Sequence, residues 1–152
     1  MAGYRFRVKL DAAPTECWRD IVVGSDRTLV DVQRAVNESM GLDQAHLWFF
    51  GRDEDYWRSS VKYQSPAEAD DDFATPRPDE RLENAGTTTV ADLELDVGDR
   101  ICYVFDYGAE WRFYAILKEI DESVSNDEEA AVEAEKGEQV DQYAPPGEGT
   151  YR

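Results

Sequence analysis

The chain has 152 residues, which is the length of one domain with room for a tail. With 41% apolar and 12% aromatic residues it can bury a hydrophobic core. Its 34 acidic and 16 basic residues give a formal net charge of −18, which weighs against an extended basic surface for nucleic acid.

The excess of acid has two interpretations. Acidic blocks are often solvated or disordered tails. Alternatively, the whole surface is acidic because the cell is rich in salt, where the Debye length is about 3 Å at 1 M and repulsion between carboxylates is screened. The twelve arginines against four lysines, and the acidic clusters in the predicted loops, favour the salt-adapted interpretation.

Cysteine content and hydropathy indicate the compartment. Cys17 and Cys102 are too far apart in the chain to form a disulfide framework or a zinc motif, so each is expected to be a small buried residue. No signal peptide or membrane span is recognised. We therefore expect a cytoplasmic protein without a membrane partner.

The first two predicted strands form a hairpin. Tyr4–Leu10 alternates apolar and basic residues, and Arg5, Arg7 and Lys9 share one face. Cys17–Val23 follows as the second strand, and its broken alternation at Asp20–Ile21 predicts a β-bulge.

A helix follows this hairpin. Thr28 fits its N-cap, with Asp31 completing a capping-box-like pair, and Gly41 ends it. The apolar residues at helical spacing are Leu29, Val32, Val36 and Met40. The residues assigned to the opposite, polar face are Arg34, Asn37 and Glu38.

The second half of the chain is expected to contain a strand, a long loop and a hairpin. His46–Gly51 is the strand, 52–60 an edge or turn, and 63–88 an acidic surface loop of unusual length. Thr89–Leu93 repeats the earlier Thr-x-x-Asp pattern and predicts a short capped helical turn. The longest apolar run predicts the hairpin, with strands Ile101–Phe105 and Glu110–Ile120.

These elements predict an α+β domain over residues 1–120. Its fold would be a single mixed β-sheet with one main crossing helix, in the β-grasp-like order β-β-α-β-(short helix)-β-β. The first strand would pair with the last hairpin. Residues 121–152 are expected to be an acidic tail, partly helical at Asp127–Lys136 because alanine and glutamate favour helix.

Several segments together resemble one protein family. They are YRFRVKL, ECWRDIVV, TLVDVQRAVNESMG, HLWFF and VADLELDVGDRICYVFDYGAEW, which span about residues 4–120. Their order resembles the plasmid pRiA4b ORF-3-like family, some members of which are known as insertion-sequence passenger proteins of TnpR type. The resemblance implies a link with mobile elements, and it implies no defined activity.

The chain departs from the family pattern at polar positions. Asp106, Gly108 and Trp111 match the hairpin motif, whereas Ala109 and Phe113 stand where the family has Asp and His. Elsewhere, Trp48 replaces the second His of a His-Leu-His motif, and a C-terminal Cys is missing. These changes remove groups that could ligate a metal.

Enzymatic chemistry finds little support in the residues. A serine recombinase needs a serine held among several arginines, and no predicted ordered element provides this. His46 is the only histidine, and a structural role is favoured over metal ligation. Asp106 and Glu110 could bind a hard cation, although no calcium-loop spacing is present. Asp106 is more simply a turn former.

The remaining candidates are aromatic and basic side chains. Trp18 and Arg19 could form a surface platform, but a core tryptophan beside an arginine paired with an acid such as Asp20 or Asp31 is favoured. Trp111 is expected to pack against the helix. The basic stripe of strand one, with Arg19 and Arg112 on the same face, could bind nucleic acid.

We therefore predict a non-enzymatic binding or interaction module with an unknown protein partner, in a salt-adapted cytoplasm. The alternatives are an accessory nucleic-acid-binding protein associated with mobile elements, and a metal-binding protein. No catalytic residue, metal ligand or cofactor is assigned. The candidate binding residues are Arg5, Arg7, Lys9, Trp18, Arg19, His46, Asp106, Tyr107, Gly108 and Trp111.

Overall fold

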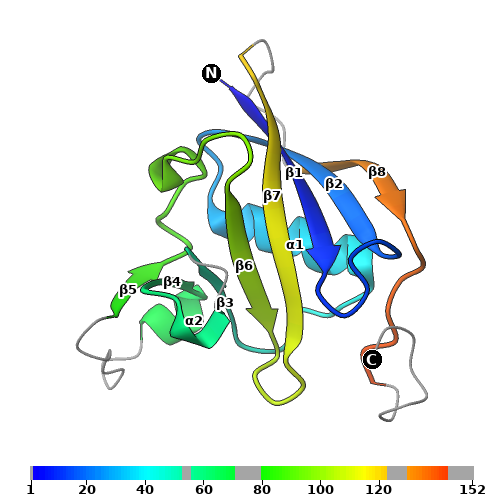
Figure 1. The fold of residues 1–152 in the computed structure, drawn as a ribbon. Helices are drawn as coiled ribbons and strands as arrows, with labels where there is room; N and C mark the ends of the chain where they lie inside the picture. The colour runs from blue at the N-terminus through cyan, green and yellow to red at the C-terminus, as the bar shows by residue number, and fades with distance from the viewer. Residues whose placement is uncertain (1, 53–55, 71–79, 123–129, 144–152) are drawn as a thin grey trace.

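The computed structural model describes residues 2–52, 56–70, 80–122 and 130–143. One mixed eight-stranded sheet runs through them in the order β5-β4-β3-β6-β7-β1-β2-β8 (Figure 1). Only β4 and β5 are parallel neighbours. The strands are β1 Gly3–Leu10, β2 Trp18–Gly24, β3 Trp48–Gly51, β4 Val61–Gln64, β5 Arg81–Asn84, β6 Arg100–Phe105, β7 Trp111–Asp121 and β8 Ala131–Lys136.

Helical segments are few in the described residues. α1 spans Leu29–Met40, α2 is the four-residue helix Pro66–Ala69, and two 3-10 turns, η1 and η2, span Tyr56–Arg58 and Ala91–Leu93. None of these helices is long and apolar enough to cross a membrane. Strands are therefore the predominant regular structure of the described residues.

The hairpin of β6 and β7 lies in the middle of the sheet, as its long apolar run predicts. β7 pairs with β6 on one side and with β1 on the other, so the expected pairing of the first strand with the last hairpin is confirmed. β2 shifts register against β8 between Asp20 and Ile21, which confirms the predicted bulge.

α1 covers one face of the sheet, which we call the inner face (Figure 1). Its predicted apolar stripe is buried there. The members of the stripe, all at most 1% exposed, are Leu29, Val32, Val36 and Met40. Gly41 ends the helix with φ 84°, as expected of a left-handed C-cap.

The two Thr-x-x-Asp patterns behave differently. Thr28 occupies the N-cap of α1, but its side chain makes no capping hydrogen bond, so the capping box predicted there is wrong. At the second pattern, Thr89 N donates to Asp92 Oδ2 at 2.9 Å and Asp92 N donates to Thr89 Oγ1 at 3.2 Å. This reciprocal pair begins the short turn η2, which confirms the predicted capped turn.

The expected α+β class with a β-grasp-like order is wrong, because three additional strands join the sheet. β4 and β5 lie in the region assigned to an edge and an acidic loop, and β8 lies in the segment assigned to a helix. The backbone of β2 would otherwise be an unpaired edge, and pairing with it overrides the helix preference of residues 131–136. The division into domain and tail at residue 120 stays a prediction.

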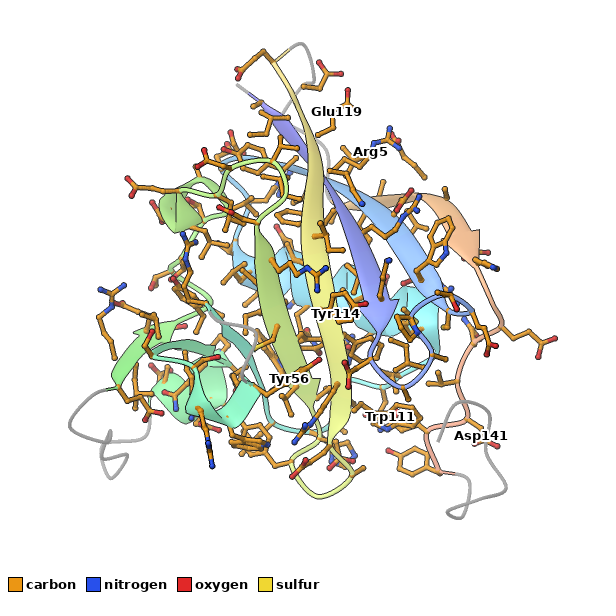
Figure 2. All side chains as sticks on the ribbon, viewed as in Figure 1. Arg5, Tyr56, Trp111, Tyr114, Glu119 and Asp141 are labelled. Atoms are coloured by element: carbon orange, nitrogen blue, oxygen red, sulfur yellow. The ribbon has the colours of Figure 1, made fainter. Side chains whose placement is uncertain are left out.

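The opposite side of the sheet, which we call the outer face, is covered only in part among the described residues. η1 packs over β3, where Trp57 contacts Phe49 and Tyr107 edge-on, with ring centroids 5.0 Å and 4.7 Å apart. Over β7, β1 and β2 this face carries half-buried polar and aromatic side chains (Figure 2).

Candidate functional site

The cations of β1 lie on the outer face, where the alternation predicted them. Arg7 donates to Asp20 Oδ1 and Oδ2 at 2.8 Å and 2.9 Å, and these hydrogen bonds raise its pKa. Arg5 forms ion pairs with Glu119, across the strand at 3.5 Å, and with Glu133 (Figure 2). The charges of Arg5 and Arg7 are therefore largely neutralised within the chain.

Trp18 and Arg19 point to opposite faces of the sheet. Trp18 is half-buried on the outer face and lies under the Arg7 guanidinium, 3.9 Å from the ring centroid, so the favoured core position is wrong. Arg19 is 1% exposed and donates to the Ser39 carbonyl at 3.0 Å and the Lys136 carbonyl at 2.7 Å. It holds the end of α1 against β8 and cannot belong to a surface stripe.

The side chain of Asp106 stabilises the turn between β6 and β7. Asp106 has φ 62°, and its Oδ1 accepts hydrogen bonds from Gly108 N at 3.2 Å and Ala109 N at 3.4 Å, as expected of a turn former. Tyr107 packs into the aromatic cluster under η1, and Trp111 is 4% exposed in the main core.

His46 lies at the surface between two carboxylates and a tyrosine. Its Nε2 is 3.2 Å from the Tyr143 hydroxyl, 3.8 Å from Asp106 and 3.9 Å from Asp43, and its ring meets Phe105 edge-on. Tyr143 also donates to Asp43, and this hydrogen bond lowers the Asp43 pKa. No group of three or more His, Cys, Asp and Glu side chains with metal-site geometry occurs among the described residues.

A groove of about 520 Å³ opens beside His46. Its walls come from three segments that are distant in sequence: one side of α1, the loop before β3, and the start of α2. This volume lies in the range of ordinary small-molecule sites. The described lining residues are Val30, Gln33 and Arg34 from α1, residues 44–47 from the loop, Trp48 at the start of β3, and residues 65–67.

Ser65 gives this groove an unused hydrogen-bonding group. Its backbone N donates to the Trp48 carbonyl at 3.1 Å, which holds it beside β3. The side chain is 4% exposed, yet its Oγ has no hydrogen-bond partner among the described residues, although it occupies the N-cap of α2. Leaving a buried hydroxyl unpaired costs about 1–3 kcal/mol, so a ligand that pairs with it gains affinity.

A buried hydrogen-bond network joins α1 to β6 next to the groove. Gln33 and Asn37 are 2% and 0% exposed, and both hydrogen-bond the hydroxyl of Tyr103 on β6. The assignment of Asn37 to the solvent face is therefore wrong. Burial raises the pKa of Tyr103 well above its usual range, so this hydroxyl stays protonated and can donate.

The described lining of the groove contains no acid, although the protein is acidic. Of the eleven described residues that line it, none is Asp or Glu, one is Arg and one is His. Of the ten candidate residues predicted from sequence, only His46 lines it. Gln33, Arg34 and Ser65 were missed because they lie on segments that only the tertiary fold brings together. A polar pair at Gln33 and Asn37, one turn apart on an apolar stripe, was the available signal.

A comparison with solved structures finds a protein that shares this fold. The solved structure of a protein of unknown function from Methanosarcina mazei Go1 matches with a TM-score of 0.67 and 16% sequence identity, over 99% of this chain and 75% of that one. At this identity the likeness shows a shared fold.

No curated protein matches the chain. A family described as plasmid pRiA4b ORF-3-like protein matches residues 2–145, which include all eight strands and the segment that follows β8. The match confirms the family that the ordered motifs resemble, and it extends beyond the 4–120 span of those motifs. The chain therefore belongs to the plasmid pRiA4b ORF-3-like protein family.

Proposed function

We propose that the protein is a non-enzymatic binding module whose ligand occupies the groove between α1, the loop before β3, and α2. The observation that carries this proposal is the buried Ser65 hydroxyl, which lines the groove without a partner among the described residues. Polar groups placed in a partly apolar hollow of this size are typical of ligand sites.

Binding explains the groove better than catalysis does. A serine nucleophile requires a base that is hydrogen-bonded to it, and the described chain places no such partner at Ser65 Oγ. His46 is instead held by Tyr143, with Asp43 and Asp106 nearby, and none of these contacts joins it to Ser65.

We place this module in a salt-adapted cytoplasm. The net charge of −18 supports the salt adaptation, and the two free, buried cysteines, Cys17 and Cys102, support a reducing compartment. An accessory nucleic-acid role linked to mobile elements has less support, because Arg5 and Arg7 are already paired with carboxylates.

A fragment screen followed by amide chemical shifts tests the groove. We expect the shifts to cluster on residues 30–34, 44–48 and 65–67. Ala67→Trp, at an exposed position in the groove wall, should abolish them. Ala91→Trp, at an exposed position in η2 outside the groove, is the matched control and should keep them. Shifts that map elsewhere, or that survive Ala67→Trp, would refute the proposal.

A further inference from the structure

We infer that the ligand of this groove is a small organic carboxylate with an apolar body, whose carboxylate is bound by Arg34 and whose second polar contact is the Ser65 hydroxyl. This inference rests on the proposed function and names the chemical class of its ligand.

Arg34 is the cation available to such a ligand. It is exposed on α1, and within the described part of the chain it forms no ion pair. Other arginines are paired: Arg5 with Glu119, and Arg112 with Glu110 at 2.9 Å. A guanidinium presents parallel N–H donors that match the two oxygens of a carboxylate, which makes it the residue best suited to hold this group.

The surroundings of Arg34 orient the ligand. On one side the side chain borders the groove, and on the other it borders a small hollow that also contains Asp31 and Glu38. Those two carboxylates repel an anion from the outer side. A ligand carboxylate at Arg34 is therefore favoured on the groove side, where none of the described lining residues is acidic.

The remaining wall selects an apolar body. Leu47 is 43% exposed, an unusual exposure for leucine in this structure, and Trp48, Val30 and Pro66 lie beside it. Burying these side chains against an apolar group removes their surface from water. Ser65 lines the groove beside Pro66 and Ala67 at the start of α2 and can hydrogen-bond either a second carboxylate oxygen or a neighbouring polar atom.

The local charge of the groove, and not the net charge of the chain, supports an anion rather than a cation. A cationic ligand would be attracted to almost any part of a surface with a net charge of −18, and it would find no carboxylate among the described residues that line this groove. An anion is repelled by most of the surface, so its binding requires a local site such as this one, where the described lining carries no acid and Arg34 has no ion pair with a described residue.

Matched probes test this inference. Phenylacetate and hexanoate are titrated beside their primary amides, phenylacetamide and hexanamide, and beside 2-phenylethylamine and hexylamine. Binding is followed by backbone amide and arginine Nε–Hε shifts. We expect each carboxylate to bind about tenfold more tightly than its amide, in line with a charge-assisted bidentate contact, and the amines to bind most weakly.

Two variants locate the contact. Arg34→Gln should remove the preference for carboxylate over amide, and Ser65→Ala should weaken the carboxylates without reversing that preference. Lys118→Gln also removes one positive charge, at an exposed position of β7 outside the groove. It should change neither the affinity for carboxylates nor their preference over amides. Amides that bind as tightly as carboxylates in the groove would overturn the carboxylate inference and leave the binding module standing. If none of the probes shifts groove residues, both are overturned.

Discussion

The Tyr103 hydroxyl donates a 2.7 Å hydrogen bond to Asn37 Oδ1, which joins the middle of β6 to α1 inside the core. This network extends to the loop before β3, because Asn37 Nδ2 donates at 2.7 Å to the carbonyl of Asp43. Gln33 completes it on the other side, at 3.2 Å from the same tyrosine hydroxyl. The buried polar atoms are thus paired with each other, and the loop that leads into the groove is anchored to the core.

Removing this hydroxyl should destabilise the fold. Tyr103→Phe leaves Asn37 Oδ1 and Gln33 Nε2 without their shared partner, and we expect the free energy of unfolding to fall by about 1–3 kcal/mol. Urea unfolding at a fixed KCl concentration measures the change. Tyr114→Phe removes a hydroxyl from a half-buried outer-face residue and should change it by less than about 0.5 kcal/mol. Equal effects of the two variants would show that the network adds no stability.

Arg19 should be among the most sensitive charged positions. Arg19→Met leaves the carbonyls of Ser39 and Lys136 without their donor in a buried site, and we expect a loss of about 2–4 kcal/mol by urea unfolding. Arg112→Met breaks an ion pair between half-exposed side chains and a contact of the guanidinium with the Tyr56 ring, for which we expect at most about 1 kcal/mol. A loss below 1 kcal/mol for Arg19→Met would contradict the anchoring role.

Gly51 is required by close packing under η1. A Cβ added there would lie 2.3 Å from Ser59 Oγ and 2.6 Å from Cys102 Sγ, both buried. We expect Gly51→Ala to cost about 1–3 kcal/mol in thermal or urea unfolding, as overpacked cores do. At Gly108 the nearest atom to an added Cβ is 3.6 Å away, so Gly108→Ala is the control and should have little effect. A tolerated Gly51→Ala would mean that η1 is not held against β3.

The contact between Tyr143 and Asp43 should be visible in an acid titration. The hydrogen bond from Tyr143 lowers the Asp43 pKa, so Tyr143→Phe should move that pKa upward, as measured by carboxyl carbon NMR. A carboxyl whose pKa is lowered in the folded state stabilises the fold above its unfolded pKa of about 3.9. This contribution is lost as the pH falls through the folded pKa. An unchanged Asp43 pKa in Tyr143→Phe would refute the contact.

The salt-adapted interpretation has its own test. With a net charge of −18, screening should favour the compact state, so the urea midpoint should rise steadily between about 0.1 M and 2 M KCl. Circular dichroism at each salt concentration measures it. A midpoint that stays constant or falls with KCl would contradict salt adaptation.

The candidate residues show how far sequence reasoning reaches toward a site. The face of Arg5, Arg7 and Lys9 was predictable because alternation in a strand directly specifies the side on which each residue lies. The pairing of Arg7 with Asp20 was not, because it depends on the register between β1 and β2. The groove could not be predicted at all, since Arg34, His46 and Ser65 belong to three segments that meet only in the folded chain.

By itself, the sequence determined the central hairpin, the N-terminal hairpin with its bulge, the apolar stripe of α1 and the family. These features follow from short-range periodicity, which a local stretch of chain carries whatever its neighbours are. Only the tertiary structure decided that residues 131–136 form β8 and that residues 61–64 and 81–84 pair as β4 and β5. An edge strand satisfies its backbone through a distant partner, and this long-range hydrogen bonding outweighs the weak local preferences of the residues involved.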